Sequence, residues 1–253
     1  MNKELEIAIK AAKESGKVLM KYFNKNVKAE KKSDNSPVTV ADRESEKKIV
    51  SIIKKYFPDH NFLCEEFNYK KTDSPYKWII DPLDGTRNFV RGNSIFGSFI
   101  ALEKEGKIIA GAVNMPAMNI FCYASLGNGA FLNGKRAKVS GISKLKDAYL
   151  SFGDIKNFLK EYHNQFTKLV NSCDFNRGYG DALHYLLLAQ GSWDIALEFV
   201  KPWDIAALKI IIEEAGGKVT DLKGNDSIYS GNALATNGKL HDESLKILNE
   251  KRK

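Results

Sequence analysis

The sequence predicts a mixed fold of helices and sheets, α+β in its first half and α/β in its second half. Apolar residues recur at helical spacing near the N-terminus, which indicates one amphipathic helix over residues 4–24. Apolar residues on both sides of a charged turn indicate a β-hairpin over residues 98–113. Later in the chain, short apolar runs alternate with helical segments. We therefore expect two parts, residues 1–145 and residues 146–253.

The other elements follow from the same patterns, with proline marking the expected ends of segments. In the first part we expect a strand or loop at 25–37, a helix at 39–56, and strands at 62–63, 78–80, 120–125 and 130–132. In the second part we expect helices at 155–171, 182–190, 203–216 and 239–250, and strands near 193–199 and 232–236.

The composition is that of an ordinary globular protein. Hydrophobic residues make up 43% of the 253 residues and charged residues 28%, which argues against disorder, collagen-like repeats and coiled coil. No apolar run reaches the roughly 18 residues that a membrane span requires, and the lysine-rich N-terminus lacks the apolar core of a signal peptide. Three scattered cysteines without a CxxC pair indicate neither a disulfide framework nor a thiolate zinc site. We expect a cytoplasmic protein without membrane contact.

The chain is basic, with 39 lysines and arginines against 31 acidic residues and a formal charge of +8. A positive field favours anionic partners such as nucleic acids or phosphorylated metabolites. Nucleic-acid binding is not expected, because the lysines are spread along the chain and do not form clusters interleaved with aromatic residues. The charge is therefore either a solvated lysine-rich surface or a field that steers a phosphorylated substrate.

The strongest local motif is Trp78-Ile-Ile-Asp-Pro-Leu-Asp-Gly-Thr-Arg-Asn-Phe89. We expect a strand to end at Asp81 and a helix to open around Asp84, so that both carboxylates point into one cleft. Mg²⁺ prefers such oxygen ligands together with water and substrate phosphate. Gly85 allows close approach of the backbone to a phosphate group. The alternative is a simple turn followed by a helix N-cap.

Two further acidic positions strengthen the first interpretation. Glu65-Glu66 closes another short strand, and because adjacent strand residues point to opposite faces, only one of the two should face the cleft. Asp204 stands at the start of a predicted helix. Taken singly, the glutamates could belong to a solvated loop, and Asp204 could be a carboxylate favoured by the helix dipole.

Together these motifs resemble the inositol monophosphatase family of Mg²⁺-dependent, lithium-sensitive phosphatases. The resemblance rests on Glu65-Glu66, on the run from Asp81 to Phe89, and on Trp203-Asp204-Ile-Ala-Ala with Glu214-Ala-Gly-Gly217, in this order along essentially the whole chain. One departure is Cys64, where the family usually has glycine. The resemblance implies the layered αβαβα sandwich of the family, commonly as a homodimer.

The resemblance also implies roles for residues of the site. The implied metal ligands are Glu65, Asp81, Asp84, Asp204 and the backbone carbonyl of Leu83. These residues would hold two or three Mg²⁺ ions, for which Mn²⁺ could substitute. Gly85 and Thr86 match positions whose amides hold phosphate. Glu65, Thr86 and Asp42 match the groups that hold a metal-activated water for in-line attack on phosphorus and accept its proton.

The substrate must be recognised by other residues, for which the candidates are Asp84, Arg177, Asp181 and Glu198. In the inositol-specific branch a small or hydroxyl residue usually stands at the position of Asp181. An acidic residue here resembles the histidinol-phosphatase branch, and a carboxylate suits the ammonium and imidazole groups of histidinol phosphate. Alternatively, Asp181 caps the helix at 182–190, His184 simply packs, and Arg177 holds a loop.

The sequence therefore favours hydrolysis of a small phosphate monoester, with histidinol phosphate as the first expectation. Inositol-1-phosphate and fructose-1,6-bisphosphate or other sugar phosphates remain alternatives. The nucleotide branch matches less well, because it usually continues Asp-Gly-Thr with Lys-Glu-Phe where this chain has Arg87-Asn88-Phe89. Two alternatives of another class are an RNA-associated protein and a non-catalytic metal-binding protein.

Overall fold

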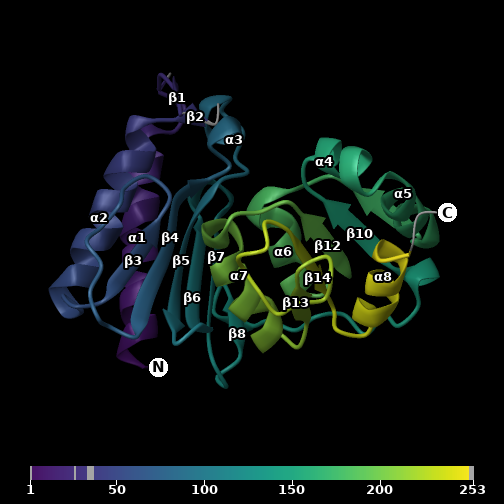
Figure 1. The fold of residues 1–253 in the computed structure, drawn as a ribbon. Coiled ribbons are helices and arrows are strands. Elements are labelled where there is room, and N and C mark those ends of the chain that lie inside the picture. The colour runs from purple at the N-terminus through teal and green to yellow at the C-terminus, as the bar shows by residue number, and fades with distance from the viewer. Residues whose placement is uncertain (1, 26, 33–36, 251–253) are drawn as a thin grey trace.

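The computed structural model describes residues 2–25, 27–32 and 37–250, and it arranges them in five alternating layers (Figure 1). The helices are α1 (Lys3–Tyr22), α2 (Val40–Tyr56), α3 (Thr86–Val90), α4 (Ile155–Glu161), α5 (His163–Ser172), α6 (Asp181–Ala189), α7 (Pro202–Glu214) and α8 (His241–Leu248), with 3-10 turns η1 (Pro116–Met118) and η2 (Leu145–Asp147). The strands of the first part are β1 (Glu30–Lys31), β2 (Pro37–Val38), β3 (Asn61–Cys64), β4 (Tyr76–Asp84), β5 (Gly97–Lys104), β6 (Lys107–Met115), β7 (Ile120–Ser125), β8 (Ala130–Leu132) and β9 (Lys135–Arg136). Those of the second part are β10 (Tyr149–Phe152), β11 (Phe175–Arg177), β12 (Ile195–Glu198), β13 (Lys218–Thr220) and β14 (Ala233–Thr236).

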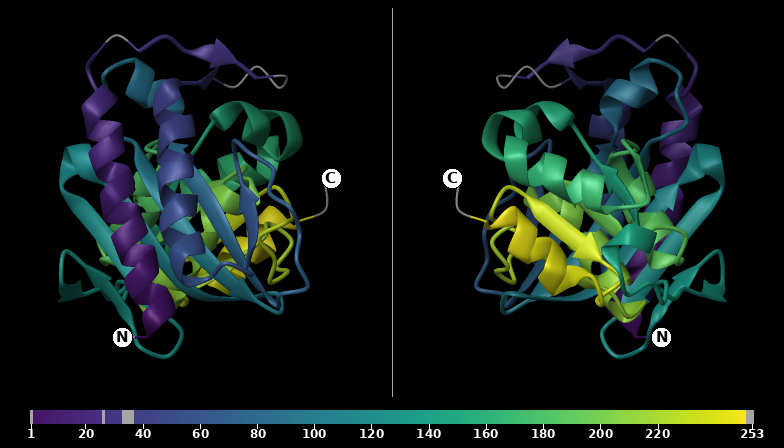
Figure 2. Two further views of the ribbon diagram at one scale, coloured as in Figure 1. Left: turned by 90° about the vertical axis from the view of Figure 1, so that its left-hand side faces the viewer. Right: turned by 90° about the vertical axis from the view of Figure 1, so that its right-hand side faces the viewer.

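Two large sheets organise the chain. The first runs in the order β3-β4-β5-β6-β7-β8-β9, with β3 parallel to β4 and the remaining pairs antiparallel. The second has the order β11-β10-β12-β14-β13, with parallel pairs on the β10 side and antiparallel pairs at β14. The short β1–β2 pair lies apart from both sheets, near α3 at the upper rim (Figure 2).

Apolar clusters join the layers. Helices α1 and α2 cover one face of the first sheet around the fully buried Trp78. Helices α6 and α7 lie between the two sheets, in a cluster that draws residues from both halves of the chain. Helices α4, α5 and α8 cover the outer face of the second sheet. The predicted αβαβα sandwich is therefore confirmed, and the two halves share a core at their junction.

Local signals explain where the helices that frame the site begin. Helix α2 starts with a capping box, in which the Thr39 hydroxyl accepts from the Ala41 amide and Asp42 accepts from the Thr39 amide. Helix α7 starts with Pro202 in its first turn, and Asp204 accepts from the Lys201 amide. Both helix starts thus place an acidic side chain at a fixed position.

Three differences from the sequence prediction have local causes. The helix expected at 155–171 is interrupted at Tyr162, whose φ of −130° and ψ of 25° are not helical. Strands β10, β11 and β13 have only three or four residues, too few to show an alternating pattern. Strand β4 does not end at Asp81 but continues through a bulge to Asp84.

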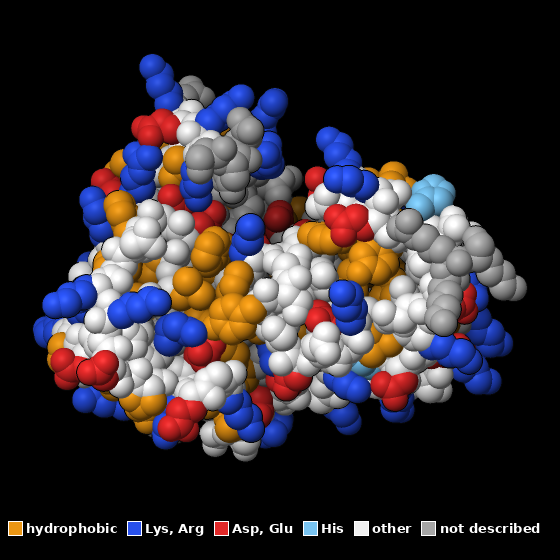
Figure 3. All heavy atoms as spheres, in the orientation of Figure 1, with side chains coloured by type: hydrophobic (Ala, Val, Ile, Leu, Met, Phe, Trp, Pro, Cys, Tyr) orange, Lys and Arg blue, Asp and Glu red, His pale blue; other side chains and the backbone are white. Residues whose placement is uncertain are grey.

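Charged side chains are scattered over the face that Figure 3 shows, and this face is hollowed between its two upper lobes. The scatter agrees with the lysine distribution in the sequence. In the described residues no helix is long and apolar enough to cross a bilayer.

Candidate active site

The central feature of the site is the β-bulge in β4. Asp81 pairs with Phe99 and Asp84 pairs with Gly97, so that β4 carries one extra residue between these two pairs. The Leu83 amide donates to Asp81 Oδ1 over 2.9 Å, and the Ser45 hydroxyl donates to the carbonyl of Pro82 over 2.9 Å. The bulge therefore turns two acidic residues of one strand toward the same region and pins the backbone between them.

The turn after the bulge requires glycine. Gly85 has a φ of +74°, and a Cβ at this position would lie 2.6 Å from the carbonyl oxygen of Ile95. The short helix α3 begins at the next residue, Thr86. A helix opening at this point was predicted, and the steric reason for the glycine is the nearby backbone.

Thr86 and Asp42 form a hydrogen-bonded pair. The Thr86 hydroxyl lies 3.2 Å from Asp42 Oδ1 and 3.0 Å from the carbonyl oxygen of Leu83. It has one proton and can fully serve only one of these acceptors. Asp42 Oδ2 accepts from both the amide and the hydroxyl of Thr39, and burial of the side chain raises the pKa of Asp42. Asp42 Oδ1 therefore faces Thr86.

Glu65 and Glu66 lie together and not on opposite faces. Strand β3 ends at Cys64, so the strand rule does not apply to the bend that follows it. Lys32 Nζ lies 2.7 Å from Glu65 Oε1 and 2.5 Å from Glu66 Oε1. Of the two glutamates, only Glu65 lines the cavity described below, as expected, although the alternation of strand residues is not the reason. Cys64 itself is a buried free thiol whose pKa is raised by burial.

Glu46 holds the loop that carries Glu65 through hydrogen bonds to its backbone. The carboxylate of this fully buried residue accepts from the backbone amides of Glu66 (2.8 Å) and Phe67 (2.9 Å). Burial raises the pKa of Glu46 to about 7. No motif in the sequence marks Glu46, although it stands four residues after Asp42 and therefore on the same face of the helix.

Carboxylates from distant segments converge at the bulge. Burial and then the charges of Glu65, Asp84 and Asp204 raise the pKa of Asp81 well above its usual range. Burial also raises the pKa of Asp204 to about 7, and the negative charges of Glu65 and Glu198 add to this rise. The residue itself is only half-buried. Such mutual repulsion falls when a cation is present. The donor set of oxygens alone suits Mg²⁺.

The side chains expected as metal ligands thus provide the oxygen donors that a Mg²⁺ site requires. Within the described ranges, no three acidic, histidine or cysteine side chains are already gathered as a complete ligand set. The ammonium group of Lys32 lies against Glu65. Lys32 lies 33 residues from Glu65, in a lysine-rich stretch that gave no signal for this contact.

The second part of the chain supplies the other wall of the site. Asp181 Oδ2 accepts from Asn88 Nδ2 over 2.7 Å, and Asp84 Oδ2 accepts from the Ala182 amide over 3.1 Å. Asp181 does not cap α6, because the N-cap is Gly180 and makes no side-chain cap bond. Burial and the charge of Glu198 raise the pKa of Asp181 to about 7.

Arg177 is not brought together with these residues. It is exposed at the end of β11 and donates to the Asn176 carbonyl over 2.9 Å. Its guanidinium carbon lies 4.3 Å from the centroid of the Phe175 ring. These contacts are within its own strand. They favour the alternative in which Arg177 holds a loop.

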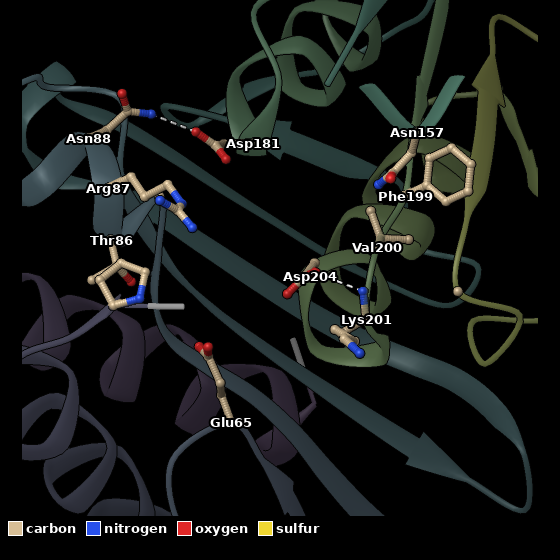
Figure 4. Close-up of a pocket in the computed structure, with 13 residues that line it drawn as sticks. Glu65, Thr86, Arg87, Asn88, Asn157, Asp181, Phe199, Val200, Lys201 and Asp204 are labelled. Atoms are coloured by element: carbon tan, nitrogen blue, oxygen red, sulfur yellow. Dashed lines mark hydrogen bonds between the residues drawn. The ribbon is translucent and has the colours of Figure 1, made fainter. Parts of the chain in front are cut away.

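A cavity of about 780 Å³ connects the two walls, and this volume is in the range of small-molecule sites. Figure 4 shows Glu65, Thr86, Arg87 and Asp204 around its centre, with the Asn88–Asp181 pair at one end. The residues that line it are Pro37, Glu65, Gly85, Thr86, Arg87, Asn88, Asn157, Asp181, Phe199, Val200, Lys201, Asp204 and Gly231. Acidic and basic side chains therefore share one solvent-accessible space.

The fold places acidic side chains at a sheet bulge beside one cavity, and these features together with the matches that follow indicate a hydrolase of phosphate monoesters. A profile of the inositol monophosphatase family matches residues 1–253. The chain belongs to the inositol monophosphatase family, whose members are generally Mg²⁺-dependent.

Relatives with different names are similar to the chain over nearly its whole length. A histidinol-phosphatase of Mycobacterium tuberculosis is 39% identical over 231 residues, which are 88% of this chain and 89% of that protein. A fructose-1,6-bisphosphatase/inositol-1-monophosphatase of Thermotoga maritima is 37% identical over 255 residues, which are 97% and 96% of the two chains. A solved IMPase structure from Thermotoga maritima has a TM-score of 0.88 at 36% identity and covers 98% of this chain and 97% of that chain.

Proposed function

We propose that the protein is a histidinol-phosphate phosphatase that works with two or three Mg²⁺ ions, for which Mn²⁺ could substitute. The observation that carries the substrate proposal is the pair Asp181 and Glu198: Asp181 lines the cavity, and the negative charge of Glu198 helps to raise the pKa of Asp181. A substrate with an ammonium and an imidazole group would relieve that repulsion. Relatives that are named histidinol-phosphatase support the same choice.

The metals would be held by Glu65, Asp81, Asp84, Asp204 and the Leu83 carbonyl. When bound, Mg²⁺ supplies Lewis-acid polarisation of the phosphoryl group and neutralises charge on its oxygens. Asp81, Leu83 and Asp84 lie in the bulged end of β4, Asp204 lies in the first turn of α7, and Glu65 follows the end of β3.

Residues of the chain would accept the proton that the attacking water releases. The Thr86 hydroxyl can donate to Asp42 Oδ1, and it then offers its lone pairs to a water molecule beside the phosphate. The carboxylates of Asp42 and Glu65 would accept the proton released by that water. Thr39 keeps Oδ2 of Asp42 occupied, so the proton path is confined to Oδ1.

The chain also positions the phosphate ester. The turn at Gly85 and Thr86 borders the cavity, and its amides are suited to hold phosphate oxygens. Asp84 and Asp181 lie next to this turn, at the end of the cavity that would receive the organic part. Glu198, at the end of β12, acts on Asp181 through its charge and would face the organic part from there.

The test is phosphate release with Mg²⁺, with kcat/KM measured side by side for histidinol phosphate and inositol-1-phosphate. We expect a preference of at least about tenfold for histidinol phosphate, because one charge-assisted hydrogen bond stabilises by about 1.5–3 kcal/mol. A preference for inositol-1-phosphate would refute the substrate proposal. No turnover of any phosphate ester would point to a non-catalytic protein.

A second candidate substrate is a bisphosphorylated sugar such as fructose-1,6-bisphosphate. Arg87 and Lys201 both line the cavity, and either could bind a second phosphate group. Arg87→Ala should then raise KM for fructose-1,6-bisphosphate far more than KM for a monophosphate. Equal changes in both KM values would exclude this role.

We also propose a homodimer, on the resemblance to the family. The mass in solution tests this: light scattering should give twice the 28.4 kDa of the chain. The division into residues 1–145 and 146–253, the cytoplasmic location and the absence of nucleic-acid binding stay predictions.

A further inference from the structure

A buried histidine lies next to Glu198, one of the carboxylates proposed to recognise the substrate. His184 is fully buried in the first turn of α6, and its Nε2 lies 3.1 Å from Glu198 Oε2. Among the described residues, neither ring nitrogen of His184 makes a well-aligned hydrogen bond. The ring packs edge-on against the Tyr185 ring, with 4.1 Å between the ring centroids, and this contact provides no hydrogen bond to either ring nitrogen. Glu198 is thus the polar group within reach of the imidazole in this part of the structure.

The carboxylate of Glu198 is confined from its other side by glycines. A Cβ at Gly153 would collide with the Oε1 end of Glu198, and one at Gly180 would lie 3.4 Å from Oε1. Glu198 therefore occupies a slot between two backbone segments and the His184 ring. Only 15% of its side chain is exposed.

The same helix face carries Asp181. Asp181 and His184 are three residues apart and hence neighbours on one face of α6. The charge of Glu198 acts on Asp181. Asp181 lines the cavity, whereas His184, about one helical turn further along α6, is not among the lining residues and contacts Glu198.

An imidazole in this place is costly if it serves only for packing. A buried polar group without a hydrogen-bond partner destabilises a protein, whereas leucine would fill similar space without that cost. Hydrogen bonds at active sites are often poorly aligned without ligand and tighten in the complex. The 3.1 Å approach of Nε2 to Oε2 fits such a contact.

We propose that His184 is a positioning residue that donates from Nε2 to Glu198 and holds this carboxylate toward the organic part of the substrate. The proposal rests on the proposed function, in which Glu198 recognises the substrate. It assigns to His184 a role in substrate affinity and none in the chemical step.

The experiment compares His184→Leu, His184→Gln and a control, His241→Leu, in the full chain. His241 is equally buried but bonds Thr220 and Thr236 beneath the second sheet. Steady-state kinetics with histidinol phosphate and melting temperatures are measured for each variant. We expect His184→Leu to raise KM about tenfold, which corresponds to about 1.4 kcal/mol, with kcat changed less than about twofold. His184→Gln, which keeps a donor, should recover much of the affinity, and His241→Leu should lower only the melting temperature.

A double-mutant cycle decides whether His184 acts through Glu198. In the Glu198→Gln background, His184→Leu should have little further effect on KM. Full additivity of the two effects would overturn the proposal, as would an unchanged KM or an equal loss of kcat in His184→Leu. If His184→Leu does not fold, His184→Phe, which also removes the donor, takes its place in the same cycle, and an unchanged KM would overturn the proposal. Gly153→Ala displaces Glu198 from the opposite side; an unchanged KM in this variant would remove Glu198 from substrate binding and with it the role of His184.

Failure of the substrate proposal can be told apart from failure of this inference. If the wild-type protein prefers inositol-1-phosphate, histidinol phosphate is wrong as the substrate. The role of His184 is then decided by KM for inositol-1-phosphate in the same variants, because Glu198 would accept hydrogen bonds from its hydroxyl groups.

Discussion

Replacing Asp204 by asparagine should stabilise the metal-free protein. The asparagine side chain would keep an oxygen that accepts from the Lys201 amide, so the start of α7 stays capped. The change removes one charge from a group in which Glu65, Asp81 and Glu198 also repel one another. The destabilising charge is needed only when a cation binds.

The magnitude follows from the pKa of Asp204, which rises from 3.8 to about 7 on folding. Between these values the folded protein binds more protons than the unfolded chain, so stability falls as pH rises from about 4 to about 7. At about 1.4 kcal/mol for each pKa unit, the full effect at pH 8 is about 4 kcal/mol. Because Asp204 is only half-buried, solvent screening reduces it, and we expect about 2 kcal/mol.

The assay is thermal unfolding in EDTA at pH 5, 6.5 and 8. A gain of about 2 kcal/mol in a chain of this size raises the melting temperature by roughly 4–8 °C at pH 8, and the gain should shrink toward pH 5. Addition of Mg²⁺ should stabilise the wild-type protein more than the variant. Asp73→Asn, at an exposed position, is the matched control and should change nothing. A lower melting temperature for metal-free Asp204→Asn at pH 8, or a gain independent of pH, would refute the reasoning.

Three further predictions concern the walls of the site. Glu46→Gln replaces one carboxylate oxygen, which accepts from a backbone amide, with an NH₂ group that can only donate. It should lower the free energy of unfolding in urea by about 1–3 kcal/mol and weaken Mg²⁺ binding in calorimetry. An unchanged Mg²⁺ affinity would contradict the role of Glu46. Gly85→Ala brings a Cβ to 2.6 Å from the Ile95 carbonyl at a positive φ, which should cost about 1–3 kcal/mol and lower kcat/KM at least about tenfold; normal kinetics would show that the turn tolerates a side chain. Lys32→Met removes the cation beside Glu65, so the metal-free protein should melt at a lower temperature while Mg²⁺ binds more tightly; weaker Mg²⁺ binding would argue against competition between Lys32 and the metal.

The sequence predicts the parts of the site that depend on local chain geometry. Asp81, Asp84 and Thr86 lie within six residues, and their turn chemistry can be interpreted directly. The bend after Cys64, which brings Glu65 and Glu66 to the same lysine, cannot be predicted in this way, because the exact end of β3 cannot be read from apolar residues. The bulge in β4 was not foreseen for a similar reason, since it depends on pairing with β5.

Contacts between distant segments lie beyond such patterns. Lys32 reaches Glu65 across 33 residues, and Asn88 reaches Asp181 across 93. The sequence offers for His184 only the alternative that it packs, because its neighbour Glu198 is known only once β12 is placed beside α6. Charge and spacing identify which residues are candidates, whereas topology decides which of them meet.

The architecture also explains why overall identity separates the substrates of this family poorly. The catalytic wall is fixed to the second part through a few bonds, such as the Ala182 amide on Asp84 and Asn88 on Asp181. In the function proposed above, the wall that would face the organic part of the substrate depends on few side chains, chiefly Asp181 and Glu198. Exchanging these would change the charge that the site presents while leaving the bulge and its carboxylates in place. Relatives named for histidinol phosphate and for sugar or inositol phosphates are accordingly similar to this chain at nearly equal identity, 39% and 37%. Substrate preference in this fold should therefore follow the side chains at the start of α6 and the end of β12.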